Sequence, residues 1–381
     1  MSATVASAPP VAERTGHPFL TYDMIQEIPD AIGKTIENSA SRIRSITDRV
    51  KGRPHCYFTG CGTAFFSAML GSNMFSLMED NASKFEYSQA LELGNYHNIV
   101  SDSVVFGVSH SGITKTTVDA LRAVKSRSGY AVGVTHFNDR PISEVADETI
   151  VVGNGPDKSR CHTKCYPAGA LPLTLLALDL LEQGHSVEAN RLHTIRKELE
   201  EMPRLANSVL SSTETTMKEL AETYYDKRAV YFAGTGGSCA NALEAALKIM
   251  ETSYLPAQGF ETEQLLHGPW CSLDERSILF VMSTERSMYE RNADCVRAAS
   301  SLGATVIPLV FEGDRDIAGM SRDVIRLPIV DEKLAAYLSI IPLYLFAYYL
   351  SVRLGNNPDY LRYLTPTYWN ARTIIFPPGT H

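Results

Sequence analysis

The chain has 381 residues, of which 44% are hydrophobic and 20% charged, and its formal net charge is −8. This composition is typical of a globular protein with a sizeable core, and the length suffices for two or three domains. Because the chain is acidic and its Lys and Arg residues are scattered, nucleic acid is not an expected partner.

The first segment, residues 1–19, is rich in Ala, Ser and Pro and is expected to be a disordered tail. It lacks a basic stretch followed by an apolar one, so no secretion signal is expected. The seven cysteines are irregularly placed and lack zinc-site spacing. We therefore expect reduced thiols, no metal site, no cofactor and a cytoplasmic protein.

An internal repeat is the main organising feature of the chain. The stretch Tyr57–Thr63 matches Tyr231–Gly237 at an offset of 174 residues (231 − 57), and each reads as a strand followed by a glycine turn. The runs at 104–108, 129–132 and 149–152 recur at the same offset. Within each copy short β-branched runs alternate with helical segments, which predicts two tandem doubly wound parallel sheets of the α/β class.

The repeat sets the expected domain boundaries. The first domain is predicted at residues 20–185 and the second at 227–355. The stretch 186–226 has Glu, Lys, Arg and Leu at helical spacing and is expected to form two connecting helices. Residues 356–381 are expected to be a tail near the ligand site, which either closes over the ligand or packs as a structural strap.

One apolar stretch, residues 334–350, is a candidate membrane span. It is short for that role, contains Pro342 and carries many tyrosines. We therefore expect a buried core helix and no membrane partner.

Hydroxyl side chains gather where the second predicted strand of the first copy ends. Ser109, Ser111 and Thr114 directly precede a predicted helix, so their hydroxyls and the free helix amides suit a phosphate group. Thr63, in the turn after the first strand, adds another donor. Ordinary helix capping would also use such residues. The second copy has Glu285 in place of Ser111, so the phosphate site is expected in the first copy alone.

A charged stripe marks one helix of the second copy. Glu244, Lys248 and Glu251 fall at i, i+4 and i+7 among Ala, Leu, Ile and Met residues, so they share one helix face. Burial raises the pKa of a carboxyl group toward working pH, as a general acid or base requires, and a lysine one turn away tempers that effect. The alternative is an exposed helix face with a simple Glu–Lys pair.

Three segments together resemble the SIS (sugar isomerase) family: Cys61–Thr63, Ser109–Thr114, and Ala242–Glu251 with His267–Pro269. The likeness is to tandem-SIS proteins, namely the isomerase half of glutamine:fructose-6-phosphate amidotransferase, SIS-type glucosamine-6-phosphate deaminases and fructosamine-type 6-phosphate deglycases. It covers nearly the whole chain from about residue 20 and implies a small sugar phosphate as ligand, held by the first-copy hydroxyls.

The resemblance also implies catalytic roles. Glu251 is expected to be the base that moves a proton between C1 and C2, with Lys248 beside it. His267 is expected to assist ring opening, often from a neighbouring subunit, which implies a homodimer with a shared active site. The alternative for His267, which lies in a turn before Gly-Pro, is a structural hydrogen bond.

Further sugar contacts are implied at positions where the chain matches or departs from the family. Gly62 lies in the matching glycine turn, and His110 stands where a Gln is common. His162 and Lys164 belong to a His-Thr-Lys segment that replaces the family's Ser-Thr-Lys loop, with Arg160 nearby.

The departures leave three functions open. An N-terminal glutaminase domain and the family's tail lysine, replaced here around Pro366, are both absent, so transfer of glutamine nitrogen is not expected. The principal expectation is an amino-sugar-phosphate isomerase or deaminase. A deglycase is the alternative if Arg160 or Lys164 binds the carboxylate of a sugar–amino acid conjugate. A non-catalytic sugar-phosphate sensor is the third.

Overall fold

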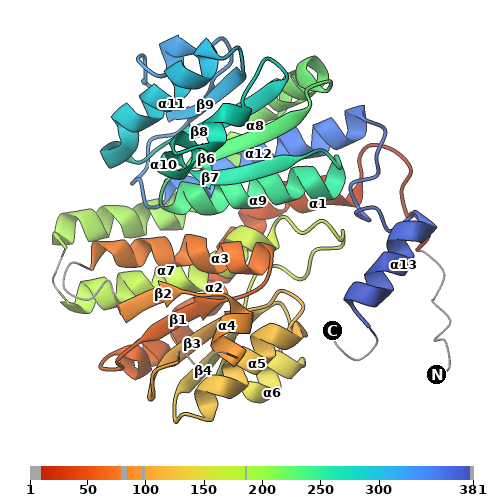
Figure 1. Cartoon of the computed structure of the whole chain (residues 1–381). Helices are drawn as coiled ribbons and strands as arrows, with labels where there is room; N and C mark the ends of the chain where they lie inside the picture. The colour runs from red at the N-terminus through yellow and green to blue at the C-terminus, as the bar shows by residue number, and fades with distance from the viewer. Residues whose placement is uncertain (1–9, 79–83, 96–98, 185–186, 378–381) are drawn as a thin grey trace.

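The computed structural model describes residues 10–78, 84–95, 99–184 and 187–377 (Figure 1). The strands of its first half are β1 (Cys56–Thr59), β2 (Phe85–Tyr87), β3 (Val104–Val108), β4 (Tyr130–Thr135) and β5 (Glu148–Val151). Those of its second half are β6 (Ala229–Gly234), β7 (Ala257–Glu261), β8 (Ser277–Ser283), β9 (Thr305–Phe311) and β10 (Ile325–Leu327).

Helices flank these strands throughout. The helices up to the middle of the chain are α1 (Leu20–Gln26), α2 (Ile28–Val50), α3 (Thr63–Ser72), α4 (Ala90–Asn95), α5 (Lys115–Lys125), α6 (Pro141–Val145), α7 (Cys165–Gly184) and α8 (Ala189–Tyr224). The later ones are α9 (Gly237–Thr252), α10 (Thr262–Leu266), α11 (Tyr289–Ser301), α12 (Ala335–Arg353) and α13 (Pro366–Ile375). Short 3₁₀ turns lie at Asn73–Leu77, Pro269–Ser272, Arg286–Met288 and Ala318–Met320.

The strands form two parallel five-stranded sheets, which confirms the expected α/β class. Their strand orders are β2-β1-β3-β4-β5 and β10-β9-β8-β6-β7, the same order read from opposite edges. This is the flavodoxin-like order, in which ligands bind at the carboxyl ends of the strands. The internal repeat extends to the register, because Phe58 pairs with Phe106 in one sheet and Phe232 pairs with Phe280 in the other.

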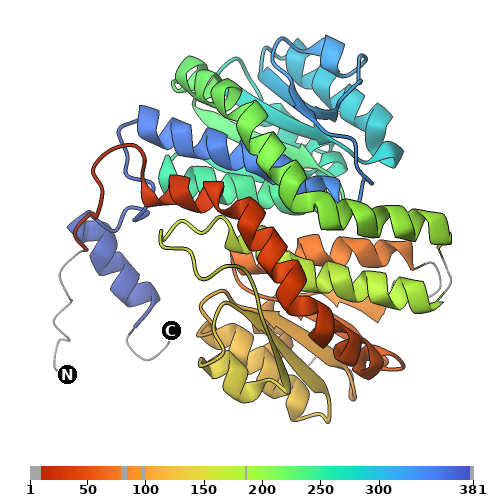
Figure 2. The same ribbon diagram turned by 180° about the vertical axis from the view of Figure 1, so that it is seen from behind.

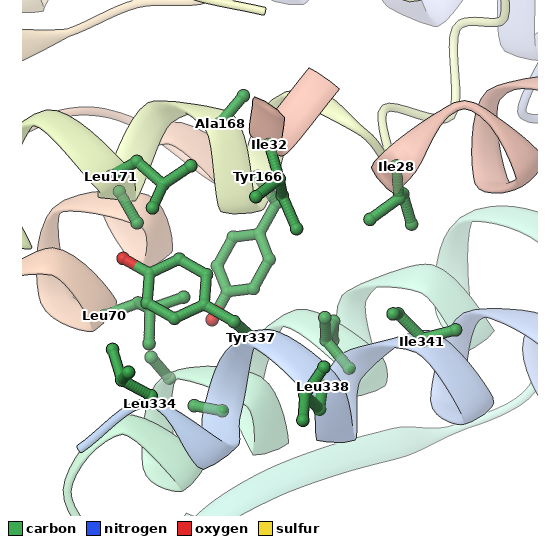
Figure 3. Close-up of a cluster of buried hydrophobic side chains, with 14 of the residues drawn as sticks. Ile28, Ile32, Leu70, Tyr166, Ala168, Leu171, Leu334, Tyr337, Leu338 and Ile341 are labelled. Carbon is green, nitrogen blue, oxygen red and sulfur yellow. The ribbon is translucent and has the colours of Figure 1, made fainter. Parts of the chain in front are cut away.

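Helices α7 and α12 pack at the centre, where the two domains meet. Side chains from α2, α3, α7 and α12 form one cluster there, among them Leu171, Tyr337 and Ile341 (Figure 3). Both helices are long and apolar enough to span a membrane by length and composition, and both are 94% buried within the fold. Both helices therefore lie in the core of the fold, where the removal of their apolar surface from water is stabilising.

The segment between the domains differs from the prediction, since α8 is one helix of 36 residues rather than two. Its buried residues keep a helical period from Leu192 to Ala221, straight through Pro203, so one continuous stripe packs on α2 and α12 (Figure 2). The proline lies at Gly33 of α2, where the absence of a side chain leaves room for its ring.

The N-terminal tail is also more ordered than expected, within the part that the structure describes. Arg14 forms an ion pair with Asp23, and the backbone N–H of Phe19 donates to the Tyr348 hydroxyl at 3.1 Å. Residues 1–9 lie outside the described residues. Tethering to α12 therefore orders residues whose composition alone suggests disorder.

Candidate active site

The predicted phosphate loop follows β3 and leads directly into α5. The Ser109 hydroxyl lies 3.1 Å from the Thr114 hydroxyl and accepts the backbone N–H of Gly112 at 3.1 Å. Gly112 has φ +70°, and a Cβ there would lie 2.7 Å from Cβ of Arg140. Thr114 is the N-cap residue of α5, yet its side chain makes no capping hydrogen bond. Capping by Thr114 therefore does not account for the hydroxyls of this loop.

The equivalent turns of the two copies differ in what lies over them. Gly62 and Gly236 have nearly the same backbone conformation, with φ 57° and 59°. A Cβ on Gly62 would meet no atom within 4 Å, whereas one on Gly236 would lie 2.5 Å from the Glu285 carboxylate. Glu285 is buried and pairs with Lys333 at 3.3 Å. A carboxylate thus fills the second copy's turn and leaves no place for an anion, whereas the first copy's turn is open.

Helices α3 and α9 pack in opposite directions across the domain interface. The start of α3 at Thr63 contacts Lys248 near the end of α9, while Gly237 at the start of α9 lies against Leu70 and Asn73 near the end of α3. This arrangement brings the last turns of α9 to the carboxyl edge of the first sheet. The charged stripe of the second copy and the phosphate loop of the first therefore belong to one region.

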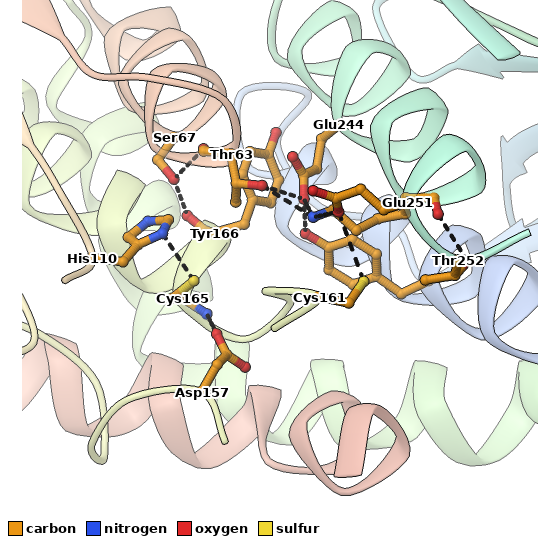
Figure 4. A network of polar contacts seen from close by, with 12 residues as sticks. Thr63, Ser67, His110, Asp157, Cys161, Cys165, Tyr166, Glu244, Glu251 and Thr252 are labelled. Carbon is orange, nitrogen blue, oxygen red and sulfur yellow. Dashed lines mark hydrogen bonds and ion pairs between the residues drawn. The ribbon is translucent and has the colours of Figure 1, made fainter. Parts of the chain in front are cut away.

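Lys248 lies at the centre of this region and is itself buried. Its ammonium contacts Oε2 of Glu251 at 2.6 Å, Oε1 of Glu244 at 3.4 Å and the Thr63 hydroxyl at 3.1 Å (Figure 4). Glu244 is fully buried and accepts a hydrogen bond from the Tyr344 hydroxyl at 2.8 Å. The stripe is therefore a buried charge cluster, and the alternative of an exposed helix face is excluded for Glu244 and Lys248.

Burial and charge shift the acid–base properties of the cluster. Burial raises the pKa of Glu244 from 4.5 to about 7, and the Glu251 charge acts in the same direction against the attraction of Lys248. Burial alone would lower the pKa of Lys248, but Glu244 and Glu251 outweigh it and raise that pKa well above the ordinary value. Lys248 therefore stays charged, and Glu244 is the group of the cluster that titrates near neutral pH.

Glu251 is the part of the stripe that reaches solvent, with its side chain 23% exposed. The Cys161 thiol donates to its Oε2 at 3.8 Å, which places the loop before α7 beside it. In that loop the His162 ring lies 5.8 Å from the ring of His110, which sits between the phosphate-loop serines. The structure thus gathers Gly62, Thr63, the phosphate loop, His162 and Glu251 around one region.

Two predicted site residues lie elsewhere. Lys164 is 2% exposed, and its ammonium forms an ion pair with Glu27 between α1 and α2, so it is a buried structural cation. His267 is largely exposed, and its Nδ1 lies 2.7 Å from the carbonyl oxygen of Glu263. It caps α10, whose first residues contact Thr235 just before α9, whereas Glu251 lies in the last turn of α9. The 14 steps from Gly237 to Glu251 rise about 21 Å, so His267 and Glu251 lie apart within one chain.

The C-terminal tail acts partly as a strap. The Asp359 carboxylate accepts the backbone N–H groups of Leu20 and Thr21 at 3.0 and 2.7 Å, and its carbonyl accepts the N–H of Arg160 at 2.8 Å. It therefore joins the start of α1 to the loop beside Glu251. Helix α13 follows, with Ile374 and Ile375 exposed.

Two features of the site were missed from the sequence. Tyr344 is one of several tyrosines in the apolar helix α12, where a tyrosine is normally a core residue, and no local pattern links it to Glu244. Glu244 was visible in the charged stripe, but its complete burial depends on α3 and α12. A hollow of about 750 Å³ lies elsewhere, between α2, α7 and α8, and includes none of these residues.

The fold and the site define an α/β protein built from two copies of one domain, with a hydroxyl-lined loop and a buried charge cluster at their interface. The SIS domain model matches residues 51–181 and 223–354, so the chain belongs to the SIS domain family.

Two enzymes illustrate the similarity in sequence. The chain is 29% identical over 357 residues to the isomerizing glutamine–fructose-6-phosphate aminotransferase of Thermococcus kodakarensis and 26% identical over 362 residues to that of Clostridium tetani. The matches cover 92% and 91% of this chain but 58% of each relative, so the chain spans little more than half their length.

Solved structures are similar in fold. The C-terminal domain of glucosamine-fructose-6-phosphate aminotransferase from Francisella tularensis matches with a TM-score of 0.82 at 21% identity, over 91% of this chain and 99% of that one. Glucosamine-6-phosphate deaminase from Thermotoga maritima matches with a TM-score of 0.73 at 18% identity, over 91% and 98%.

Proposed function

We propose that this protein is an aldose–ketose isomerase or deaminase of an amino-sugar 6-phosphate, with Glu251 as the base. The observation that carries the proposal is the Lys248 bridge, which joins Glu251 at 2.6 Å to Thr63 at 3.1 Å beside the phosphate loop. A carboxylate held by a buried cation next to an anion site suits proton transfer on a bound sugar phosphate.

In the proposed reaction the phosphate binds at Ser109, Ser111 and Thr114, and the opened sugar extends toward Glu251. Glu251 takes the proton from C2 and returns it to C1 through an enol-type intermediate. If C2 carries an amine, the product imine is hydrolysed by water to the ketose and ammonia. Without an amine, the product is the ketose alone.

The deglycase alternative is less well supported than the sequence suggested. It relied on Arg160 or Lys164 to bind a second carboxylate, and Lys164 is already paired with Glu27. A sensor would need the phosphate loop but not a partly exposed carboxylate such as Glu251 beside it.

The shared-site proposal follows from the position of His267. Because α10 with His267 begins near the start of α9 and Glu251 lies in the last turn of α9, His267 would reach a Glu251 site only in a neighbouring subunit. We therefore include a homodimer with a shared active site in the proposed function.

Glu251→Gln tests the proposal. Glucosamine 6-phosphate, fructose 6-phosphate with ammonia, and fructose 6-phosphate conjugates of amino acids are supplied, and products are identified by NMR. We expect turnover of an amino-sugar phosphate to fall about 10²–10⁴-fold in the variant, with phosphosugar binding by calorimetry retained.

Glu219→Gln, on the exposed face of α8, is the matched control and should keep full activity. Wild-type turnover by Glu251→Gln would remove Glu251 from the mechanism. Cleavage of the conjugates alone would instead identify a deglycase, and tight phosphosugar binding without any product would identify a sensor.

A further inference from the structure

A cluster of imidazole and thiol groups lies beneath the phosphate loop. His110 projects from that loop, and His162 and Cys165 come from the segment that leads into α7. One ligand atom from each of the three lies within 4.8 Å of the others. The closest approach is between Nδ1 of His110 and Sγ of Cys165, at 3.0 Å (Figure 4).

Several polar atoms around this cluster are buried and have no hydrogen-bond partner among the described residues. They include Nε2 of His110, Oδ1 of Asp157 and both ring nitrogens of His136, whose ring centroid lies 5.9 Å from that of His110. A buried polar group without a partner costs about 1–3 kcal/mol. Several such groups at one place mark a polar pocket within the core, beside the three potential ligands.

A carboxylate completes the surroundings. Asp157 accepts the backbone N–H of Cys165 through Oδ2 at 3.2 Å, which holds its carboxylate at the cluster while Oδ1 stays unpaired. Two imidazoles, a thiol and a carboxylate are the donor types that bind zinc in proteins.

The spacing is compatible with one ion. Zinc–nitrogen and zinc–sulfur bonds of about 2.0–2.3 Å place tetrahedral ligand atoms about 3.3–3.6 Å apart. In the cluster, Nδ1 of His110 lies 3.0 Å from Sγ of Cys165, and no two of the three ligand atoms are more than 4.8 Å apart. Small side-chain rotations would therefore bring the three atoms around one ion.

The surroundings shift the pKa values of these groups. Burial lowers the pKa of both His110 and His162, and the positive charge of Lys248 acts in the same direction. Burial raises the pKa of the Cys165 thiol well above its ordinary value, which makes it unsuitable as a free nucleophile.

We propose that His110, His162 and Cys165 bind a divalent transition-metal ion of the zinc class, with the Asp157 carboxylate beside the site. On binding, the Cys165 thiol loses its proton to solvent and its sulfur forms a bond to the ion. The ion would join the phosphate loop to the segment before α7. The proposal does not depend on the reaction that the protein catalyses, and no step of that reaction is assigned to the ion.

Cobalt(II) titration of the reduced, chelator-treated full chain tests the proposal, because a cobalt–thiolate bond absorbs in the near ultraviolet. We expect that band to saturate at one ion per chain and zinc to remove it by competition. The band should be absent in Cys165→Ala. His110→Gln and His162→Gln should each weaken cobalt binding by more than about tenfold, since even loss of an outer-shell partner costs that much.

Cys295→Ala provides the matched control. Cys295 is likewise buried with a raised thiol pKa, but lies in α11 of the other domain, so this variant should keep the band. Absence of cobalt binding by the wild-type chain, or an unchanged band in Cys165→Ala, would overturn the proposal. Circular dichroism establishes whether each variant is folded. If Cys165→Ala does not fold, the two histidine variants test the proposal in its place.

Discussion

Lys248 is a single buried cation shared by two carboxylates and a hydroxyl. Its ammonium has three N–H groups, and Glu251, Glu244 and Thr63 surround them. One positive charge cannot fully offset two neighbouring negative charges, so the buried carboxylate takes up a proton more readily than in water. Glu244, fully buried and also bonded to Tyr344, is that carboxylate.

The raised pKa of Glu244 predicts a pH dependence of stability. Between pH 4.5 and about 7 the folded chain retains a proton on Glu244 that the unfolded chain has lost, so the folded state loses stability as pH rises through this range. The difference is worth up to about 3 kcal/mol. Gln at position 244 does not titrate, so Glu244→Gln should lose less stability than the wild type between pH 5 and 8.

Urea unfolding at several pH values measures this effect. The difference between the wild-type and Glu244→Gln profiles isolates the residue from other titrating groups, the buried histidines among them. Glu219→Gln, which changes an exposed carboxylate, should follow the wild type. Parallel profiles for wild type and Glu244→Gln would show that Glu244 does not titrate in this window.

The two copies of the domain diverge at the loops that follow β3 and β8. In the first copy this loop presents hydroxyls and the matching glycine turn at Gly62 is open, whereas in the second Glu285 fills the turn at Gly236. The same backbone therefore leaves the turn open in one domain, where we propose the phosphate site, and is covered by a carboxylate in the other. The difference comes from side chains, since both turns have almost the same φ and ψ.

Ser111→Ala tests the phosphate role of the first loop. Loss of a hydrogen bond to a charged group costs about 1.5–3 kcal/mol, so we expect KM for a phosphorylated substrate to rise by about 10–100-fold with little change in kcat. Ser287→Ala removes an exposed hydroxyl from the corresponding loop of the second copy and should leave KM unchanged. Equal KM values for Ser111→Ala and the wild type would place the phosphate elsewhere.

At the scale of the whole molecule, the helices between the sheets fix the position of the site. Helices α3 and α9 run in opposite directions across the interface, and one hydrophobic cluster with residues of both domains holds them there. The amino end of α9 therefore lies near the carboxyl edge of its own sheet, and its carboxyl end near that of the other. This explains why Glu251 lies beside Thr63 of the first domain while His267 remains at the edge of the second.

A mixing experiment tests the shared active site. Glu251→Gln and His267→Asn are each expected to be inactive as homodimers. Heterodimers formed by refolding the two together should each contain one intact site, with Glu251 from one chain and His267 from the other. A 1:1 mixture should therefore recover about a quarter of wild-type activity. If the mixture stays inactive although heterodimers form, His267 does not act across subunits.

The sequence alone was sufficient for features that repeat locally. The 174-residue offset, the alternation of strands and helices, and the hydroxyl loop after β3 predicted the two parallel sheets, and the helical spacing of Glu244, Lys248 and Glu251 predicted their shared face. Such patterns can be recognised in the sequence because the backbone geometry of a helix or strand sets how often its side chains return to the same face.

Only the tertiary structure decided which of these groups meet. The pairing of Lys164 with Glu27, the contact of Tyr344 with Glu244 and the approach of Cys165 to His110 each join segments at least 55 residues apart. The packing that keeps α8 a single helix likewise joins distant segments, because α8 contacts both α2 and α12. These contacts depend on how whole helices and strands pack against one another, and the spacing of residues along the sequence does not reveal that packing. The sequence thus identified the two halves of a site, and the antiparallel packing of α3 on α9 determined how the halves are combined.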